Sequence, residues 1–383
     1  MRSDRVSFLT QSEIRAMTRE CDRVGGINLG QGVCPLPSPP EILEAASQAI
    51  LADKSTYSRY EGVEPLRRAL ASKLERHNGL IIDPEEELVT TAGSAGAFTC
   101  ALQGLCNPGD EIIVFEPFYG YHVNAIRVSQ CVPVLVTLRA PNWELDVDAL
   151  EAAITDKTRA VVINTPANPS GKVFGEDEME AIAQLCIDHD LLAITDEIYE
   201  YMVFDGHRHI SIATLEGMRE RTVTISGFSK TFAITGWRLG YAVAPPPLAE
   251  PIGLVNDLFY ICAPTPLQHG MAAALEVLDD GYYDEICEKY RRNRDLFCDA
   301  LRQGGFEPHV PQGAYYVLAD VSKLGCETSK EAAMELLESA GVASVPGEAF
   351  FGAGSEVGSR LVRFCVAQPK EVVEEAAQRV CEF

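Results

Sequence analysis

One lysine and one arginine provide the clearest chemistry in this sequence. Lys230 follows a strand-like run (TVTIS) and a turn at Gly227, and Arg238 comes shortly after the run TGW. A lysine at the end of a buried strand can enter a cleft, where desolvation and nearby cations lower its pKa from about 10.4 and make the amine nucleophilic toward an aldehyde. An arginine beside it can hold a phosphate through two parallel hydrogen bonds. The alternative is a surface turn with two ordinary cations.

Three other segments place polar groups beside or within apolar strand-like runs. Asp196 ends the run LLAITD, where a buried carboxylate is costly unless it is paired. A protonated pyridine nitrogen would pair with it, whereas a capping aspartate is the ordinary explanation. Asn168 lies in the run NPSG, and its amide can donate to a phenolate-like oxygen. Arg363 stands inside the apolar run RLVRFCVA and therefore needs an anion.

A phosphate cup is predicted where the run TAGSAGAF joins a short strand to a helix. Small residues at such a turn expose backbone N–H groups at the helix N-terminus, although many helix starts look similar. From about residue 88 to 245, strand-like runs alternate with helix-like segments, which predicts a mostly parallel sheet covered on both faces. A ligand should then lie at the C-terminal ends of the strands. Nearer the N-terminus, a helix is expected from about Pro40, with Ser38 as its cap.

The stretch SGFSKTFAITGWRLGY resembles the lysine signature of the class I and II aminotransferases that depend on pyridoxal 5'-phosphate (PLP). The runs NPSG, PQGAYYVLAD and PGEAFFG resemble further motifs of that family, and the resemblance extends from about Leu29 to the C-terminal helix. It implies an α/β protein of PLP fold type I. A large domain with a mostly parallel seven-stranded sheet, sandwiched by helices, is expected beside a smaller α+β domain. The expected boundaries are 50–285 for the large domain, and 1–49 with 286–383 for the small one.

The resemblance also implies the roles of individual residues. PLP would be held by Lys230 as an aldimine, and the catalytic residues would be Lys230, Asp196 and Tyr199. The other cofactor-binding residues implied are Ser94, Ala95, Tyr119, Asn168, Ser229, Arg238 and, from the second subunit of a homodimer, Tyr57. Substrate would contact Gly32, Asn168 and Arg363, with Arg363 gripping the α-carboxylate. Some relatives carry serine at the position of Gly227, so Ser226 or Ser229 is expected to compensate for one phosphate contact.

The implied reaction is transamination in amino acid metabolism. The LGQG and CAPTPLQ segments look most like the branch acting on glutamine, methionine, kynurenine and aromatic amino acids. The amino group would therefore pass from a neutral, sulfur-containing or aromatic L-amino acid to a 2-oxo acid. No arginine signature for a second carboxylate is evident, which disfavours dedicated aspartate transamination. The alternative is a β-lyase of the cysteine-conjugate or cystathionine type, and a PLP-binding regulatory protein is less expected because the match leaves no room for a DNA-binding module.

Composition limits the partners and the compartment. The chain has 383 residues and a formal net charge of −24, which argues against nucleic acid or an anionic membrane as the main partner. No apolar run is long enough to span a membrane, and the N-terminus lacks the core of a signal peptide. The twelve cysteines form no C-x-x-C pair and indicate a reducing cytoplasm. The histidines show no metal-binding pattern, so no metal site is predicted.

Overall fold

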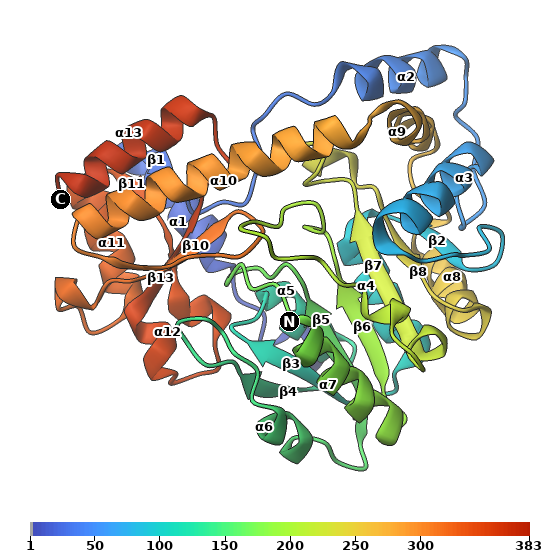
Figure 1. The fold of residues 1–383 in the computed structure, drawn as a ribbon, viewed down its shortest axis with the longest axis horizontal. Coiled ribbons are helices and arrows are strands. Elements are labelled where there is room, and N and C mark those ends of the chain that lie inside the picture. The colour runs from blue at the N-terminus through green and yellow to red at the C-terminus, as the bar shows by residue number, and fades with distance from the viewer. Residues whose placement is uncertain (1–2) are drawn as a thin grey trace.

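A seven-stranded sheet occupies the centre of the computed structural model, which describes residues 3–383 (Figure 1). Its strands lie in the order β2-β8-β7-β6-β5-β3-β4. Their bounds are Leu88–Thr91 (β2), Glu111–Glu116 (β3), Val132–Thr137 (β4), Thr158–Asn164 (β5), Leu192–Asp196 (β6), Thr222–Gly227 (β7) and Gly240–Val243 (β8). Strand β8 pairs antiparallel with β2 and β7, and the other pairs are parallel. The predicted mostly parallel seven-stranded sheet is confirmed.

Helices cover both faces of this sheet. They are α3 (Glu64–Lys73), α4 (Gly93–Leu105), α5 (Gly120–Val128), α6 (Val147–Ala152), α7 (Glu176–Asp188), α8 (Pro246–Tyr260) and α9 (Thr265–Val277). Along β3, Ile112 and Val114 join the core cluster that holds Phe98 of α4, whereas Ile113 joins the cluster that holds Ile182 of α7. Alternate residues of a strand point to opposite faces, so burial on both sides requires an unbroken apolar run.

A second, four-stranded antiparallel sheet lies in the C-terminal part, in the order β12-β13-β10-β9. Its strands are β9 (Glu307–His309), β10 (Tyr316–Asp320), β12 (Val345–Pro346) and β13 (Leu361–Cys365). The helices nearby are α10 (Asp280–Gln303), α11 (Ser329–Ala340), α12 (Glu356–Arg360) and α13 (Lys370–Cys381). The N-terminal helix α1 (Glu13–Val24) and β1 (Ile27–Asn28) lie among them, and β1 pairs with β11 (Val342–Ala343) (Figure 1). The segment 13–28 and the C-terminal part of the chain therefore share one region.

Helix α2 (Pro40–Leu51) begins where the sequence predicted, but the predicted cap is wrong. Pro39 is the N-cap residue, and no side chain caps the helix. The hydroxyl of Ser38 instead donates to the carbonyl of Ala233, 3.3 Å away. Because Pro40 has no N–H and lies in the first turn, this helix start has one fewer donor to satisfy.

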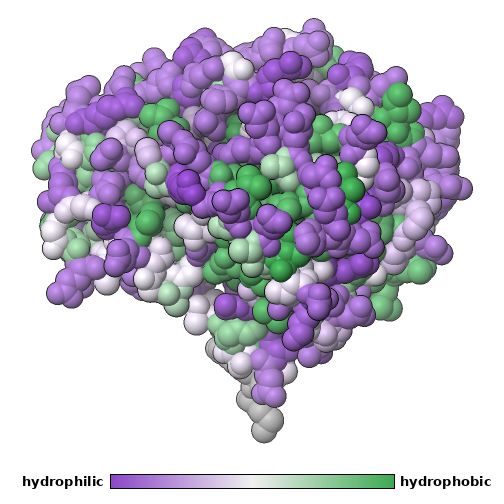
Figure 2. Space-filling view, turned by 60° about the horizontal axis from the view of Figure 1, so that its bottom comes forward, coloured by the Kyte–Doolittle hydropathy of each residue, from purple (hydrophilic) through white to green (hydrophobic). Residues whose placement is uncertain are grey.

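The surface shown in Figure 2 is largely hydrophilic, with hydrophobic side chains gathered near the centre of that face. Within residues 3–383, no helix is both long and apolar enough to cross a membrane. Large apolar side chains remain exposed at the end of α8 and just beyond it. They are Leu254, Leu258, Phe259, Tyr260 and Ile261, called here the α8 patch. Within residues 3–383 of a single chain, these side chains remain exposed to solvent.

A buried ion pair fixes the end of α3 to the segment that follows β6. The ammonium of Lys73 lies 2.6 Å from a carboxylate oxygen of Glu200, and both side chains are buried. Lys73 also donates to Asn78 at 2.9 Å and to Tyr241 at 3.1 Å. Burial alone would raise the pKa of Glu200, but the charge of Lys73 outweighs it, and the pKa falls from 4.5 to about 2. This pair therefore stabilises the fold at neutral pH.

Replacing Lys73 with methionine should destabilise the protein strongly, because Glu200 would keep a buried charge without its partner. We expect a loss of about 3–5 kcal/mol in the free energy of unfolding at pH 7, measured by denaturant titration. The contribution is fully present above pH 4.5 and is lost as the pH falls toward about 2, where Glu200 becomes protonated. The difference between wild type and Lys73→Met should therefore shrink below pH 4.5.

The matched control is Lys330→Met, which removes an exposed partner of Glu13 that lies 3.2 Å away. An exposed pair of this kind is worth about 0–1 kcal/mol. If the free energy of unfolding fell equally in Lys73→Met and Lys330→Met, the buried pair would have no special role in stability.

Candidate active site

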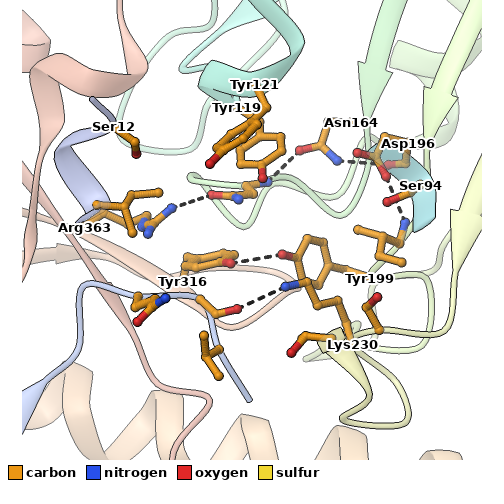
Figure 3. A pocket seen from close by; sticks show the side chains of 18 of the residues that line it. Ser12, Ser94, Tyr119, Tyr121, Asn164, Asp196, Tyr199, Lys230, Tyr316 and Arg363 are labelled. Atoms are coloured by element: carbon orange, nitrogen blue, oxygen red, sulfur yellow. Dashed lines mark hydrogen bonds between the residues drawn. The ribbon is translucent and has the colours of Figure 1, made fainter. Parts of the chain in front are cut away.

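A cavity of about 390 Å³ lies where the strand ends of the large sheet meet the smaller sheet (Figure 3). The predicted site residues that line it are Gly32, Ser94, Tyr119, Asn168, Asp196, Tyr199, Ser229, Lys230, Arg238 and Arg363. Two predicted residues do not. Ala95 is exposed beside Ser94 in the first turn of α4, and Tyr57 is 77% exposed in the loop before α3. One chain alone does not bring Tyr57 to the cavity.

Lys230 lies just past β7, with its amine inside the cavity. Its Nζ donates to the carbonyl of Gly32, 3.0 Å away (Figure 3). Burial lowers the pKa of Lys230 below its ordinary value, and the nearby guanidinium groups of Arg363 and Arg238 lower it further. A larger fraction of the Lys230 amine is therefore uncharged at neutral pH than would be the case in water, as a nucleophile or a general base requires.

The N-terminus of α4 and Arg238 form an anion cradle at one end of the cavity. Ser94 lies in the first helical turn, which carries no acidic residue. Arg238 adopts a left-handed backbone conformation, with φ 55°, and its Nη1 donates to the carbonyl of Thr235 at 2.9 Å. A Cβ atom on Gly93 would lie 2.5 Å from Nη2 of Arg238, so only glycine permits this approach. The free N–H groups and the guanidinium suit a phosphate.

Asp196 ends β6 and is oriented by two residues that the sequence analysis did not identify. One carboxylate oxygen lies 2.9 Å from Nε2 of His122, in the first turn of α5. Asn164, at the end of β5, donates to the backbone carbonyl of Asp196 at 2.9 Å and accepts from the N–H of Asn168 at 2.8 Å. Asn164 ends the strand beside β6, so strand-end position was the available signal for it, whereas His122 lies in α5, beyond the aromatic run FYGY, and had no such signal.

Arg363 is fully buried, at 0% exposure, in the middle of β13. Its Nη1 donates to the side-chain oxygen of Asn168 at 2.9 Å, and its Nη2 donates to the carbonyl of Gly30 at 2.7 Å. Nε has no partner among the described residues. Because the amide oxygen of Asn168 is occupied by Arg363, its NH₂ group is left to donate elsewhere.

Tyr199 lies on the loop after β6 and is 3% exposed. Burial raises its pKa well above 10, so its hydroxyl keeps a proton to donate. Its oxygen lies 3.0 Å from the hydroxyl oxygen of Tyr316, a cavity residue that the sequence analysis also missed (Figure 3). The N-terminal segment also forms part of the cavity wall, through Ser12 and Arg15.

These groups match the chemistry of PLP. The cradle at Gly93 accepts a phosphate, the Lys230 amine reacts with an aldehyde, and the Asp196 carboxylate pairs with a pyridinium nitrogen. Tyr199 and Asn168 provide donors for a phenolic oxygen. The unpartnered Nε of the buried Arg363 leaves further donor capacity for a carboxylate. The donor set therefore fits PLP together with an amino acid.

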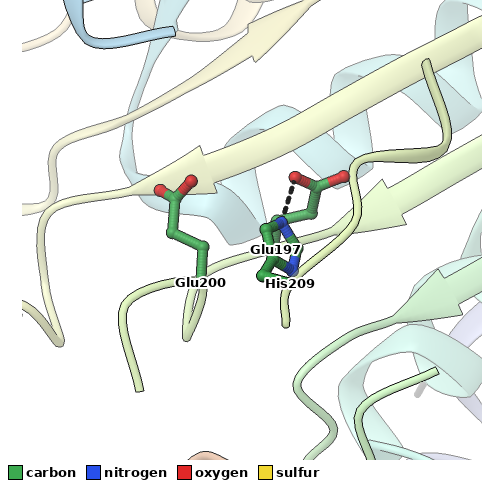
Figure 4. A group of neighbouring side chains, drawn as sticks. All are labelled: Glu197, Glu200 and His209. Atoms are coloured by element: carbon green, nitrogen blue, oxygen red, sulfur yellow. Dashed lines mark hydrogen bonds and ion pairs between the residues drawn. The ribbon is translucent and has the colours of Figure 1, made fainter. Parts of the chain in front are cut away.

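A separate acidic group, formed by Glu197, Glu200 and His209, resembles a metal site at first sight. Their candidate ligand atoms lie within 4.8 Å of one another, and Glu197 pairs with His209 at 2.8 Å (Figure 4). The carboxylate oxygens also receive hydrogen bonds from Thr195, Ser211, Ser226, Lys73 and Asn78. A metal ion would compete with the ammonium of Lys73, so the ion pair and hydrogen bonds account for this group, and we assign no metal to it.

Known proteins resemble the chain over its whole length. The model of the family described as aminotransferase class I and II matches residues 24–380. Kynurenine–oxoglutarate transaminase 3 of Mus musculus is 35% identical, covering 92% of this chain and 83% of its own. The solved structure of N-succinyldiaminopimelate aminotransferase from Mycobacterium tuberculosis is 35% identical, with a TM-score of 0.96 and 100% of both chains covered. YbdL from Escherichia coli, reported to have a methionine aminotransferase function, is 30% identical, with a TM-score of 0.96 and 100% of both chains covered.

These matches confirm the predicted family and PLP fold type I. The predicted activity is confirmed at the level of the reaction, since the matched relatives named above are aminotransferases. The chain therefore belongs to the class I and II aminotransferases, a family of PLP-dependent enzymes, and is itself a transaminase.

Proposed function

We propose that this aminotransferase moves the amino group of a neutral, sulfur-containing or aromatic L-amino acid to a 2-oxo acid. The observation that carries the proposal is the Lys230 amine, which shares one cavity with the buried Arg363. The relatives named for kynurenine and for methionine support this substrate class. Tyr119 and Tyr121, whose ring centroids lie 5.2 Å apart in the cavity wall, offer apolar surface for such a side chain.

When bound, PLP supplies the electron sink that makes the substrate Cα–H bond acidic. Lys230 would hold the cofactor before substrate arrives, and its Nζ would then move the substrate Cα proton to the C4′ carbon of the cofactor, as general base and then as general acid. Arg363 binds the substrate α-carboxylate, aided by the backbone at Gly32. Asp196 keeps the pyridine nitrogen protonated, while Tyr199 and Asn168 donate to the phenolic oxygen. The residues proposed to hold the phosphate or the ring are Ser94, Ala95, Ser229, Arg238, Tyr119 and the partner chain's copy of Tyr57.

Arg15 favours a second substrate class, namely amino acids with an additional carboxylate. It lines the cavity from α1, and its guanidinium has no hydrogen bond or ion pair within residues 3–383. A free cation in a substrate cavity attracts an anionic group. The relative named for N-succinyldiaminopimelate acts on a substrate with more than one carboxylate. Arg15 therefore makes acidic donors the alternative to neutral ones.

We also propose that the active unit is a homodimer with shared sites. The support is the α8 patch, which leaves apolar surface uncovered, and Tyr57, whose exposed ring has no place in the cavity of its own chain. We further propose a large domain over 50–285 and a small domain over 1–49 with 286–383. The pairing of β1 with β11 supports the inclusion of the N-terminal segment in the small domain. A cytoplasmic location is supported by the cysteines, all of which are free within the described residues.

Lys230→Gln should abolish transamination, because it removes the amine that holds PLP and moves the proton. We expect purified wild type to show a visible absorbance band with PLP that bleaches with an amino donor and returns with a 2-oxo acid. The variant should lack this cycle and lose at least about 10³-fold in kcat. Lys157→Gln, at an exposed lysine, is the control. A wild type that shows no band with added PLP would overturn the role of Lys230, and release of pyruvate from a cysteine conjugate would indicate β-lyase activity instead.

A donor panel with wild type and Arg15→Gln should separate the two substrate classes. We expect kcat/KM for methionine, kynurenine and phenylalanine to remain unchanged in the variant. For donors with a second carboxylate, kcat/KM should fall about 10- to 100-fold, the value of a charged hydrogen bond. Arg19→Gln, one turn further along α1, is the matched control. If kcat/KM fell equally for neutral donors and for donors with a second carboxylate, Arg15 would not select donors by their charge.

Leu258→Asp should dissociate the dimer, because it places a charge in the α8 patch, where Leu258 is 78% exposed in the single chain. Sedimentation velocity should then report a monomer, with PLP binding weakened about tenfold or more by the loss of Tyr57. Tyr57→Phe should weaken PLP binding while leaving the dimer intact. Ile81→Asp, at another exposed apolar residue, is the control. A wild type that binds PLP tightly as a monomer would refute the shared site.

A further inference from the structure

The hydroxyl of Tyr316 joins the two sheets across the cavity. Tyr316 begins β10 of the smaller sheet, whereas Tyr199 follows β6 of the large sheet. Their hydroxyl oxygens lie 3.0 Å apart, and the two residues are 2% and 3% exposed (Figure 3). A hydrogen bond shielded from water in this way is stronger and more directional than one at the surface.

The rest of Tyr316 contacts the groups proposed to bind substrate. The guanidinium carbon of Arg363 lies 4.3 Å from the centre of the Tyr316 ring, in a cation–π arrangement. The hydroxyl packs against Gly32, where an added Cβ would lie 2.1 Å from the Tyr316 oxygen. The carbonyl of Gly32 accepts from Lys230 at 3.0 Å. One side chain therefore touches Tyr199, Arg363 and the segment that holds the Lys230 amine.

Hydrogen-bond accounting fixes the direction of the Tyr199–Tyr316 bond. A tyrosine hydroxyl has one proton to donate. If Tyr199 gives its proton to the phenolic oxygen of the cofactor, the proton between the two tyrosines must come from Tyr316. Burial raises the pKa of Tyr316 to about 12 and that of Tyr199 well above 10, so both hydroxyls remain protonated at neutral pH. The other ionisable groups facing Tyr316 are Tyr119, Tyr315, Cys365 and Arg363.

We propose that Tyr316 is a positioning residue that acts through Tyr199. Its hydroxyl donates to Tyr199 and so directs the Tyr199 proton toward the cofactor, while its ring supports the guanidinium that receives the substrate carboxylate. This inference rests on the roles proposed above for Tyr199 and Arg363. A hydroxyl that accepts a hydrogen bond is itself a better donor. Loss of the hydrogen bond from Tyr316 therefore weakens the hydrogen bond from Tyr199 to the phenolic oxygen.

The test is Tyr316→Phe in the PLP-loaded enzyme, which keeps the ring over Arg363 and removes the hydroxyl alone. We expect the pH midpoint of the visible absorbance band, measured without substrate, to rise by about 0.3 to 1 unit. A weaker donor stabilises the anionic phenolic oxygen of the cofactor less. The proton that the Lys230 nitrogen holds beside this oxygen is therefore lost at a higher pH. The kcat should fall several-fold, and the KM for the amino donor should change less.

Two companion variants show whether the effect passes through Tyr199. In a Tyr199→Phe background, the Tyr316→Phe shift should disappear, because the residue through which it acts is gone. Tyr290→Phe is the matched control, since this buried hydroxyl pairs with the sulfur of Cys34, 2.9 Å away, and Tyr290 does not line the cavity. It should leave the midpoint unchanged.

Gly32→Ala provides an independent variant should Tyr316→Phe fail to fold. The added methyl would displace the Tyr316 hydroxyl and should shift the midpoint in the same direction. No shift in either variant, or an equal shift in the Tyr199→Phe background, overturns the proposal. If Tyr199→Phe shifts the band and Tyr316→Phe does not, this inference alone fails. Absence of a band in the wild type overturns the proposed function along with it.

Discussion

The buried guanidinium of Arg363 is the constraint on which the rest of the site depends. A cation at 0% exposure must be satisfied by groups from the protein or from a ligand. Asn168 from the large sheet and Gly30 from the N-terminal segment each accept one hydrogen bond from it. Both acceptors are neutral, and Arg363 forms no ion pair within residues 3–383. This arrangement joins three distant parts of the chain around one cation and leaves the cavity attractive to a carboxylate.

Local charge and net charge have opposite signs in this protein, and the local charge decides what binds. The chain carries a net charge of −24, yet Arg15, Lys230, Arg238 and Arg363 all line the same cavity. Closely grouped cations destabilise one another's charged forms, and lysine can relieve this by losing its proton, whereas arginine cannot. The same grouping therefore suits anions through the arginines, and it adds to the effect of burial in lowering the pKa of Lys230.

The sequence predicted the parts of the site that follow from position along a strand. Lys230, Asp196 and Asn168 each come just after or at the end of a buried strand, and parallel strand ends share one edge of a sheet. The contacts of Tyr316 and His122 could not be predicted in this way, because each depends on a side chain from another element. Asn164 ends β5, so its position was open to the same strand-end argument. Ser38 was misjudged because a local capping pattern cannot reveal a tertiary partner such as the carbonyl of Ala233. The roles of the individual residues remain predictions.

The run TDEIYE shows how backbone direction separates two uses of acidic residues. Asp196 faces the cavity and lies 2.9 Å from His122, whereas Glu197 is paired with His209 and Glu200 with Lys73, both outside the cavity lining. Successive residues point to opposite sides of a strand, so a shift of one residue in the register of β6 would exchange Asp196 and Glu197. The buried Lys73–Glu200 pair anchors the segment that follows β6 to the end of α3. The ion pair thus anchors the segment that carries Tyr199, although neither of its members lines the cavity.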